Sequence, residues 1–323
     1  MARQRDSTGY HAVKLTEVAA AVIERPDGSF LLGQRAPDTF YPGYWEFPGG
    51  KVEAGETPRA ALIRELHEEL EIEVLGATPW LVREHVYEHA HVRLHFFRVR
   101  EWRGELKDHV HSALAWQRPG AESVSPMLPA NAPVLAALAL PSLYGITRAH
   151  EIGIEPQLAA LEHALARGLR LVQLREAGLP ADQRESFAAS AVGLCRDYGA
   201  RVLVNGDAQL AWAVGADGIH LGSAQLKGLR GRPGFPLVAA SCHDAAELKL
   251  AAEAQLDFAV LGAVKPTASH PGRLALGWTA FAELVAGCPL PVYAIGGLGP
   301  ADLDEARAAG AHGIAAIRGA WAR

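Results

Sequence analysis

Cysteine is scarce in this sequence, with three among 323 residues, and neither sign of charge dominates. The cysteines, Cys195, Cys242 and Cys288, are far apart, so they predict neither a metal-ligand spacing nor a disulfide framework. The formal net charge is −5, so no basic field exists to hold a nucleic-acid polymer or an anionic membrane. A single nucleotide remains compatible with this charge, because a metal ion and a few donors can hold it.

Long hydrophobic runs are also missing. The first residues, MARQRDSTGYHAVKL, contain no apolar segment typical of a signal peptide, and no later stretch has 18 consecutive apolar residues. We therefore expect a cytoplasmic protein without a membrane partner. The composition, with 49% hydrophobic and 21% charged residues, is ordinary for a globular protein, and 323 residues suit two domains.

The first part of the chain predicts mixed strands with one acidic helix. Residues 17–35, EVAAAVIERPDGSFLLGQR, place two apolar runs around Pro26-Asp27-Gly28, which predicts a β-hairpin. Residues 91–102, HVRLHFFRVREW, alternate polar and apolar side chains as a half-buried strand does. A proline-rich passage then contains a short apolar helix over 133–140. We expect the domain boundary after this helix, giving domains at 1–140 and 141–323.

The second part predicts eight short apolar strands, most of them separated by alanine-rich helices. The strands are expected within 143–147, 170–176, 201–206, 218–222, 237–243, 257–264, 291–297 and 313–319, and the clearest helices at 155–168, 183–198, 245–254 and 300–309. Eight strands alternating with helices favour a closed parallel (β/α)8 TIM barrel over a doubly wound open sheet. The predicted class is therefore α/β in both parts.

Acidic residues crowd the helix expected after Thr57, which is a plausible N-cap with Pro58 at the first helical position. Glu65, Glu68 and Glu69 are three and four residues apart and share a helix face. Oxygen ligands alone suit Mg²⁺ or Mn²⁺ and not zinc. The alternative is a solvated face, in which charges such as those of Arg64 and Glu68 pair locally.

The flanks of this helix carry a family resemblance. Gly50, Glu56 and the run Arg64-Glu65-Leu66-His67-Glu68-Glu69 have the spacing of the Nudix box. With EFPGG before the box and LPAN after it, residues 17 to 140 resemble the MutT branch, the 8-oxo-dGTP diphosphatases. The resemblance implies an α/β/α sandwich with a mixed sheet. It also implies Mg²⁺- or Mn²⁺-dependent hydrolysis of 8-oxo-dGTP to 8-oxo-dGMP and pyrophosphate, which sanitises the nucleotide pool and avoids mutation.

The same resemblance implies roles for individual residues. The metal ligands would be Glu65, Glu68, Glu69 and the carbonyl of Gly49, and the catalytic residues Glu65, Glu68 and Arg64. The nucleotide-binding residues would be Arg35, Glu46, Phe47, Pro48, Gly49 and Asn131. Taken without the resemblance, the sequence favours Phe47 as a core residue, Asn131 as a turn residue and Arg35 as a solvated charge.

Three positions depart from the family pattern. Glu71 stands where the box has glycine, and Ala90 where the best-known members have a substrate-contacting arginine. The downstream metal-binding Glu falls near Val110, so Asp108, His109 or His111 would have to replace it. The histidines of this region, His85, His89, His91, His95, His109 and His111, suggest a zinc site, a nucleotide cleft or a solvated sheet face.

The second part resembles thiamine phosphate synthase and its relative thiazole tautomerase over residues 143 to 321. The segments that carry this resemblance are VQLRE (172–176), LVNGDAQLAWAVGADGIHLG (203–222), VKPTASHPG (264–272) and AIGGLG (294–299). Gly296 and Gly297 can present backbone N–H groups to a phosphate, with hydroxyls from Thr267 and Ser269. The alternative is an ordinary glycine-rich turn.

The residues that the synthase needs are depleted. Ala177 stands in place of an anion-binding Lys, and Gly206 and Gln225 in place of both metal-binding aspartates, although Asp207 follows one position late. The tautomerase needs no metal, and its Ser-x-His pattern occurs as Ser241-Cys242-His243. His243 would move a proton, or it is a structural residue.

Three hypotheses follow from these patterns. The first is a nucleotide-pool hydrolase with an appended phosphate-binding barrel. The second is a thiamine-pathway bifunctional protein, whose first half cleaves a thiamine-related pyrophosphate and whose barrel acts on a phosphorylated thiazole. In the third, the barrel is a non-catalytic sensor or dimerisation module. The sequence leaves the oligomeric state open.

Overall fold

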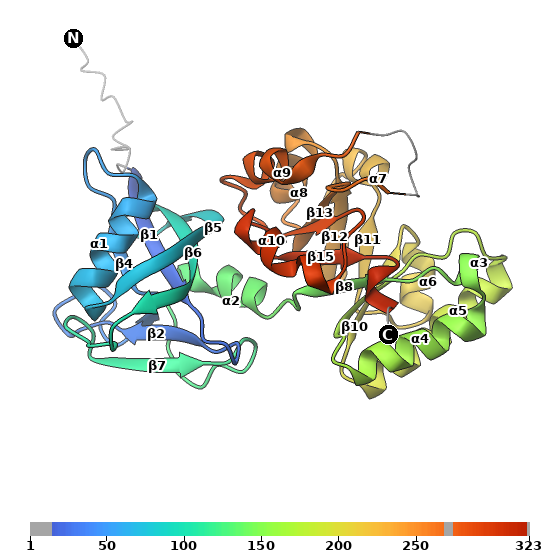
Figure 1. Ribbon diagram of the computed structural model, residues 1–323, viewed down its shortest axis with the longest axis horizontal. Coiled ribbons are helices and arrows are strands. Elements are labelled where there is room, and N and C mark those ends of the chain that lie inside the picture. The colour runs from blue at the N-terminus through green and yellow to red at the C-terminus, as the bar shows by residue number, and fades with distance from the viewer. Residues whose placement is uncertain (1–14, 268–273, 322–323) are drawn as a thin grey trace, which may run out of the picture.

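Two α/β domains make up the protein in the computed structural model, which describes residues 15–267 and 274–321 (Figure 1). The N-terminal domain contains two small sheets, and the C-terminal domain is a closed barrel. Helix α2 lies between the two domains in Figure 1 and leads into the first barrel strand.

The sheets of the N-terminal domain have the orders β4-β1-β6-β5 and β3-β2-β7. Strand β1 pairs in parallel with β6 and antiparallel with β4, so the first sheet is mixed, as expected. The elements are β1 (Leu15–Ile23), β2 (Phe30–Gln34), β3 (Trp45–Glu46), β4 (Gly49–Lys51), α1 (Pro58–Leu70), β5 (Glu73–Val86), β6 (His91–Arg103), β7 (Ala113–Gln117), the 3-10 turn η1 (Pro129–Asn131) and α2 (Ala132–Leu138).

The turn predicted at 26–28 forms, but its two strands do not remain a hairpin. The N–H of Arg25 donates to the carbonyl of Ser29 (2.9 Å), and one bridge joins Glu24 to Phe30. Beyond this bridge β1 and β2 enter different sheets. The strand predicted at 91–102 is β6, and it is buried on both faces from Phe96 to Val99 because it lies between β1 and β5 and separates two apolar clusters.

The eight strands predicted for the second part form a closed parallel barrel with the order β10-β11-β12-β13-β14-β15-β8-β9. This closure confirms the barrel and excludes the open sheet. The strands are β8 (Leu143–Ile146), β9 (Leu171–Leu174), β10 (Arg201–Asn205), β11 (Gly218–Leu221), β12 (Leu237–Cys242), β13 (Phe258–Gly262), β14 (Val292–Ile295) and β15 (Gly313–Ala316).

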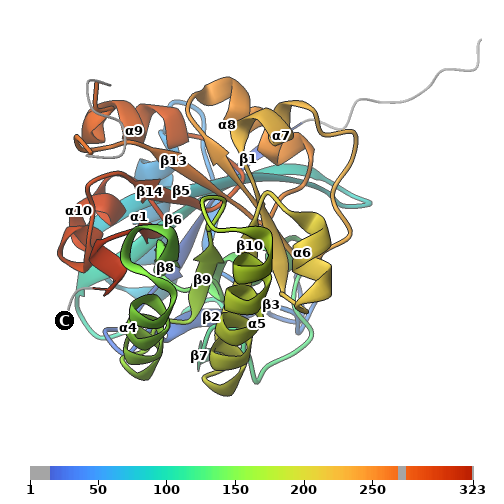
Figure 2. The same cartoon turned by 90° about the vertical axis from the view of Figure 1, so that its right-hand side faces the viewer.

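Helices surround this barrel, as the view from its side shows (Figure 2). They are α3 (Ala149–Ile152), α4 (Ile154–Ala166), α5 (Ala181–Asp197), α6 (Ala208–Ala213), α7 (Ser223–Lys227), α8 (Ala245–Glu253), α9 (Gly277–Val285) and α10 (Leu303–Ala308), with 3-10 turns η2 (Pro300–Asp302) and η3 (Gly319–Trp321). Large side chains, including Tyr144, Phe258 and Tyr293, fill the barrel interior. A separate apolar cluster joins the strands to the helices.

Buried polar contacts join the two domains. The guanidinium of Arg98 in β6 lies 4.2 Å from the ring centroid of Trp80 and 3.3 Å from Nδ1 of His312, which precedes β15. Nε2 of the same His312 lies 2.9 Å from the carbonyl oxygen of Leu140. Arg83 of β5 donates to the carbonyl of Pro289, just before β14, at 2.7 Å. The N-terminal domain therefore packs against the end of the barrel where its strands begin.

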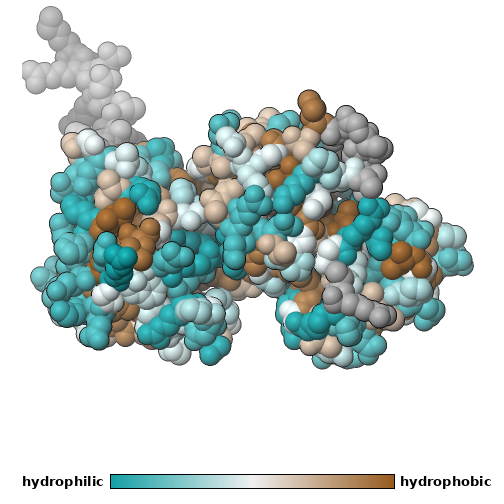
Figure 3. Space-filling view, viewed as in Figure 1, coloured by the Kyte–Doolittle hydropathy of each residue, from teal (hydrophilic) through white to brown (hydrophobic). Residues whose placement is uncertain are grey.

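The surface of the protein is mostly hydrophilic on the face shown in Figure 3, with small apolar patches. Among the described residues, no helix combines the length and apolar character needed to cross a membrane.

Candidate active sites

Helix α1 presents its acidic residues from a well-anchored position. The side chain of Thr57 accepts a hydrogen bond from the N–H of Ala60 (3.2 Å), which confirms the predicted N-cap. Leu62, Leu66 and Leu70 are fully buried and fix the helix against the sheet. The helix ends at Glu71, which adopts the left-handed conformation (φ 55°) that glycine would adopt more easily. Its carboxylate is held by ion pairs to Lys107 and His109.

Arg64 organises the acids around it. Its Nε and Nη2 bind the two carboxylate oxygens of Glu56 at 2.9 and 3.0 Å, and its Nη1 lies 2.9 Å from Glu65 and 3.3 Å from Glu68. The hydrogen bonds from Arg64 lower the pKa of Glu56 to about 2. The arginine thereby orients acids from both the helix and the preceding loop, as the resemblance implies.

Glu69 is the acid whose protonation is most perturbed. Burial raises the pKa of its carboxyl to about 8, against a hydrogen bond from the N–H of Gly49 (3.0 Å), and the charges of Glu65, Glu46 and Asp108 raise it further. A buried carboxylate among other acids needs a cation to remain ionised. The oxygen-only donor set therefore fits a divalent metal ion such as Mg²⁺.

The metal ligands are not gathered in advance. Within residues 15–267 and 274–321, no three His, Cys, Asp or Glu side chains are grouped closely enough to hold a metal ion. The backbone of Gly49-Gly50 approaches them closely: a Cβ at Gly50 would lie 2.3 Å from the carboxylate of Glu65. Only glycine leaves room for this acid. The residues present thus fit the ion, while Glu65 and Glu69 are engaged by Arg64 and Gly49.

The loop between β6 and β7 contains the three residues considered as replacements for the missing downstream Glu. The charge of Asp108 acts on Glu69, whereas His109 pairs with Glu71 at 3.2 Å and Val110 is exposed. The ring of His111 packs against Gly33, where a Cβ would lie 2.2 Å from it. Of the three residues considered, Asp108 is the acid placed to act with Glu69.

The expected nucleotide residues lie near these acids but are engaged by the fold. Phe47 is 4% exposed, and its ring packs against Phe30 and Phe96 in the core. Nδ2 of Asn131 donates to the carbonyl of Trp45 at 3.1 Å. Arg35 and Glu46 form an ion pair, with Nη1 and Oε2 2.5 Å apart. The carbonyl of Pro48 accepts a hydrogen bond from the N–H of Ala21.

A group of exposed and half-buried rings adjoins this region, and of its members the sequence patterns had named only His89. Phe40 stacks on His89 with ring centroids 4.2 Å apart, and Tyr41 contacts Tyr87 and His89. The charges of Glu46 and Arg35 act on the hydroxyl of Tyr87, so the rings border that ion pair. The histidines form no zinc site among the described residues; His91 pairs with Glu84 and His95 with Glu17.

The barrel has a cavity of about 700 Å³ at the ends of its strands, opposite the N-terminal domain. Its ionisable lining side chains are Arg175, Arg318, His220 and His243, along with the buried thiol of Cys242, and no Asp or Glu is among the described lining residues. Gly296 and Gly297 line it with positive φ, and a Cβ at Gly296 would lie 2.5 Å from that of Ala263. The ionisable side chains of this lining therefore favour an anion over a cation as the ligand of the cavity.

Two hydroxyl residues, Thr267 and Ser269, were also predicted to bind phosphate. Thr267 lines the cavity, and its buried hydroxyl has no hydrogen-bond partner among the described residues. Ser269 lies outside the described residues. A bound phosphate oxygen would satisfy the hydroxyl of Thr267.

A chain of buried hydrogen bonds forms the floor of this cavity, and all its members except Tyr144 lie in the segments, or in the Ser-x-His pattern, that carry the resemblance. Asn205 donates to Gln173 (3.2 Å), and Gln173 donates to the hydroxyl of Tyr144 (3.1 Å). This hydroxyl lies 3.3 Å from Nδ1 of His220, whose Nε2 lies 2.8 Å from the hydroxyl of Ser241. Burial lowers the pKa of His220 to about 3, so its ring is neutral near pH 7.

His243 lies on the wall of the cavity with its ring fixed by an acid. Nδ1 is 2.9 Å from Oε2 of Glu247, and the backbone N–H of His243 donates to the same oxygen at 2.8 Å. The other oxygen of Glu247 accepts from Ser223 (2.6 Å) and Lys227 (2.7 Å). Nε2 of His243 is thus the ring nitrogen left for a ligand. Sequence patterns had not identified Glu247.

The positions that replace the synthase aspartates carry no metal-binding chemistry. Nε2 of Gln225 donates to the carbonyl of Gly206 at 2.8 Å, so the two positions bind each other. Asp207 caps α6 by accepting from Leu210 and pairs with Arg184 at 3.7 Å. Asp207 is not among the described lining residues, so it does not replace the lost aspartate there.

Comparisons with known proteins match each of the two domains to a different family. The family model described as NUDIX domain matches residues 14–138, and the one described as thiamine monophosphate synthase matches residues 143–320. A CTP pyrophosphohydrolase of Escherichia coli K12 is 43% identical over 131 residues, covering 39% of this chain and 92% of that protein. A putative thiamine-phosphate synthase of Geobacter sulfurreducens is 38% identical over 183 residues, covering 54% and 84%.

Among solved structures, a thiamine phosphate pyrophosphorylase from Pyrococcus furiosus aligns with a TM-score of 0.46 and 26% identity, covering 55% of this chain and 85% of that one. The Nudix assignment supports a hydrolase that acts on pyrophosphate bonds, and both families bind small phosphate-containing molecules. The chain belongs to the Nudix hydrolases through its N-terminal domain and to the thiamine monophosphate synthase family through its barrel.

Proposed function

We propose that residues 1–140 form a Mg²⁺- or Mn²⁺-dependent nucleoside triphosphate pyrophosphohydrolase, with a phosphate-binding barrel appended over residues 141–323. The observation that carries this proposal is the buried carboxyl of Glu69: burial and the charges of Glu65, Glu46 and Asp108 raise its pKa to about 8, so a positive charge is needed to keep it ionised near pH 7. When bound, the divalent ion supplies that charge and activates water for attack on phosphorus. Glu65, Glu68 and Glu69 would hold it, with the carbonyl of Gly49.

Arg64 and the glycine pair contribute positioning to this reaction. Arg64 holds Glu56 and Glu65 in one network, so the acids need little reorganisation when the ion and the triphosphate arrive. Gly50 leaves the space that Glu65 occupies. The products would be a nucleoside monophosphate and pyrophosphate.

The base is proposed from the amide of Asn131. Nδ2 donates one of its two hydrogens to the carbonyl of Trp45, and Oδ1 is the unused acceptor of this amide, which we propose meets the base. Unmodified guanine presents an acceptor at N7, whereas 8-oxoguanine carries a hydrogen there, and cytosine presents an amino donor at N4. The amide therefore favours 8-oxo-dGTP, the substrate implied by the MutT resemblance, or CTP, the substrate named for the Escherichia coli relative, over dGTP.

Competition between 8-oxo-dGTP, CTP and dGTP on the purified protein tests this proposal. We expect kcat/KM for at least one of the first two to exceed that for dGTP by tenfold or more, since one such contact contributes about 1–3 kcal/mol. Asn131→Ala should erode this ratio more than it lowers kcat, while Asn205→Ala, in the barrel, should leave it unchanged. Equal hydrolysis of all three nucleotides would refute the base assignment.

The presence of these two families in one chain favours a second function. Since residues 143–320 match the thiamine monophosphate synthase family, the Nudix half would cleave a thiamine-related pyrophosphate in this alternative. Thiamine diphosphate as a fourth substrate in the same competition distinguishes the two. A kcat/KM for thiamine diphosphate above that for every nucleotide would replace the nucleotide proposal by this one.

For the barrel we propose binding of a phosphorylated thiazole and proton transfer by His243, without synthase turnover. The pairing of Gln225 with Gly206 and the lack of carboxylates in the cavity support the loss of the synthase reaction. Glu247 holds His243 so that Nε2 can exchange a proton with a ligand.

The full-length protein can be given both synthase substrates with Mg²⁺ and, separately, the thiazole carboxylate phosphate tautomer. Tautomer conversion that His243→Ala abolishes is expected. Robust thiamine phosphate formation would overturn the proposal, and binding without conversion would show the sensor of the third hypothesis.

A further inference from the structure

Three arginines meet where the N-terminal domain packs against the barrel. Arg98 and Arg100 are two residues apart in β6, so they share a face of that strand, and Arg307 lies in α10 of the barrel. The charges of Arg100 and Arg307 both act on the guanidinium of Arg98. We call these three residues the arginine seam.

The elements that carry the arginine seam are in direct contact. Figure 1 shows α10 next to β5, and a Cβ at Gly310, just after α10, would lie 3.4 Å from the carbonyl oxygen of Pro79 in β5. Nδ1 of His312 lies 3.3 Å from Nη2 of Arg98. The arginine seam therefore belongs to the domain boundary, at the end of the barrel opposite the cavity of about 700 Å³.

The arginine seam has one buried acid against its three positive charges. Glu24, just after β1, lies 3.4 Å from Nη1 of Arg98 and 2.8 Å from Nη2 of Arg100. Arg307 pairs with Asp304 at 3.8 Å, but the side chain of Asp304 is fully exposed, so this pair balances little charge. Three guanidinium groups therefore face one buried carboxylate.

Several buried donors of this boundary also lack hydrogen-bond partners. Nε of Arg98, Nε of Arg307 and Nε1 of Trp80 have none among the described residues. The side chain of Arg98 is only 7% exposed, and burial, together with the charges of Arg100 and Arg307, lowers its pKa to about 10 against the charge of Glu24. Buried donors are rarely left unpaired in folded proteins, which indicates that an acceptor from outside the chain completes the site.

The chemistry of the arginine seam selects an oxyanion as this acceptor. Water satisfies N–H groups but leaves the repulsion among the guanidinium groups in place. A phosphate brings several acceptor oxygens together with negative charge, and guanidinium groups bind it well. The side chains of Arg100 and Arg307 are 33% and 26% exposed, so an ion reaches them from solvent, with Arg98 beneath.

We propose that the arginine seam binds a phosphate or diphosphate ion, and that the bound ion strengthens the packing of the two domains. The ion bridges Arg98 and Arg100 of the N-terminal domain to Arg307 of the barrel, while Glu24 keeps its pair with Arg100. This site is separate from both candidate active sites and depends on neither proposed activity.

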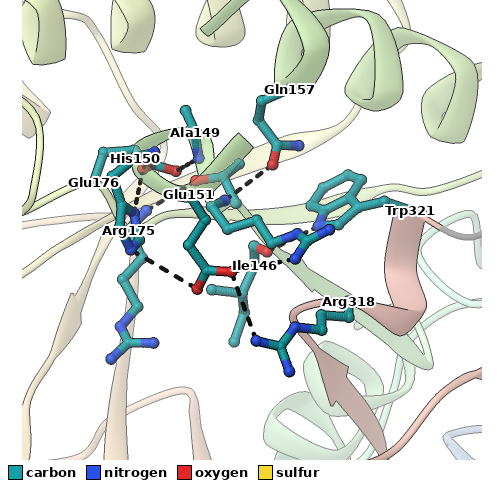
Figure 4. Close-up of polar contacts among 11 residues, drawn as sticks. Ile146, Ala149, His150, Glu151, Gln157, Arg175, Glu176, Arg318 and Trp321 are labelled. Atoms are coloured by element: carbon teal, nitrogen blue, oxygen red, sulfur yellow. Dashed lines mark hydrogen bonds and ion pairs between the residues drawn. The ribbon is translucent and has the colours of Figure 1, made fainter. Parts of the chain in front are cut away.

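Titration of the full-length protein with inorganic phosphate in EDTA, followed through the indole N–H signals of tryptophan in NMR, tests this site. The ring of Trp80 lies 4.2 Å from the guanidinium of Arg98 and reports on the arginine seam. Trp321 reports on the barrel cavity, because its Nε1 donates to the carbonyl of Ile146 (3.0 Å) near Arg318 (Figure 4), and both residues line that cavity. The variants Trp80→Phe and Trp321→Phe assign the two signals.

We expect the Trp80 signal to shift and saturate with phosphate, and the affinity read from it to fall at least tenfold in Arg307→Gln. Arg307→Lys keeps the charge and should retain most of the affinity. Arg103→Gln is the matched control, since Arg103 is an exposed arginine of the same strand, 3.8 Å from Glu73, and it should bind as the wild type does. A parallel titration with inorganic pyrophosphate shows which of the two ions binds more tightly.

Melting of the same variants separates binding from a structural role of Arg307. Without added anion, Arg307→Gln should melt at the same or a higher temperature than wild type, because it removes a charge that Arg98 and Arg100 repel. Saturating phosphate should raise the melting temperature of wild type by more than that of Arg307→Gln, because the ion binds the folded wild type more tightly.

Three results would overturn the proposal. The first is a Trp80 signal that neither anion moves, even where the Trp321 signal shifts. The second is unchanged affinity at the Trp80 signal in Arg307→Gln. The third is an Arg307→Gln variant that melts below wild type without anion, which would show that Arg307 stabilises the domain boundary by itself.

Discussion

Replacing Glu247 by glutamine tests how the ring of His243 is held. Glu247 is 2% exposed and receives four hydrogen bonds, from Ser223, from Lys227 and from the ring and the backbone of His243. Burial opposes its ionisation, but these hydrogen bonds outweigh burial and lower its pKa to about 2 from the ordinary 4.5. Glutamine keeps the shape and removes the charge.

The sign and size of the effect follow from proton linkage. Because the folded pKa of Glu247 is depressed, its stabilisation is fully present above the unfolded pKa near 4.5 and is lost as pH falls through 2. A depression of this size corresponds to about 3 kcal/mol near pH 7 and to about 1 kcal/mol at pH 3. We therefore expect Glu247→Gln to lower the free energy of unfolding by about 3 kcal/mol at neutral pH, and the difference from wild type to shrink in acid.

Urea unfolding of both proteins between pH 7 and pH 3 measures this difference directly. Glu253→Gln is the control, because Glu253 lies at the end of the same helix, is exposed and pairs with Lys249 at 3.7 Å. Its replacement should change the free energy of unfolding by less than about 0.5 kcal/mol. A difference between Glu247→Gln and wild type that is constant with pH, or below about 1 kcal/mol at pH 7, would refute the reasoning.

Two further predictions concern the N-terminal domain. Gly50→Ala should lower kcat at least a hundredfold and leave the melting temperature within about 2 °C, because its Cβ displaces only the end of the Glu65 side chain; an unchanged kcat would contradict it. Arg98→Met should lower the free energy of unfolding by about 1–3 kcal/mol, because it leaves Nδ1 of the buried His312 without its donor while Glu24 keeps Arg100, and should separate the melting of the two domains in calorimetry. Arg103→Met, at an exposed ion pair, is its control, and equal melting of both variants would show that Arg98 does not join the domains.

Periodic and local patterns were predictable from the sequence. The eight apolar runs predict the barrel, because each strand is short, buried and separated from the next strand by a helix. Such a pattern depends only on residues that are neighbours along the chain. The start of α1 was predictable for the same reason, since Thr57 caps it through Ala60 only three residues away. The end of α1 was not, because the backbone N–H groups of Lys107 and His109, far along the chain, bind the last carbonyls of the helix at Leu70 and Glu69.

Features built from distant residues escaped prediction. Glu247 gains its role from α7 and from the end of β12, and the chain from Gln173 through Tyr144 to His220 crosses three strands. The contact between Arg98 and His312 joins residues more than two hundred positions apart. No spacing rule connects such residues, because the barrel closure and the domain packing bring them together.

The hydrolysis of a nucleoside triphosphate by Glu69→Gln, at saturating Mg²⁺, tests the central claim most directly. The account predicts that kcat falls by orders of magnitude while the fold is kept. Since the pKa of Glu69 is raised to about 8, its carboxylate destabilises the metal-free protein at alkaline pH, so in EDTA at pH 9 the variant should melt at the same or a higher temperature than wild type. Glu73→Gln, an exposed acid next to the helix, should retain full turnover. Turnover by Glu69→Gln equal to that of the wild type would contradict the assignment of this acidic helix as the catalytic metal site.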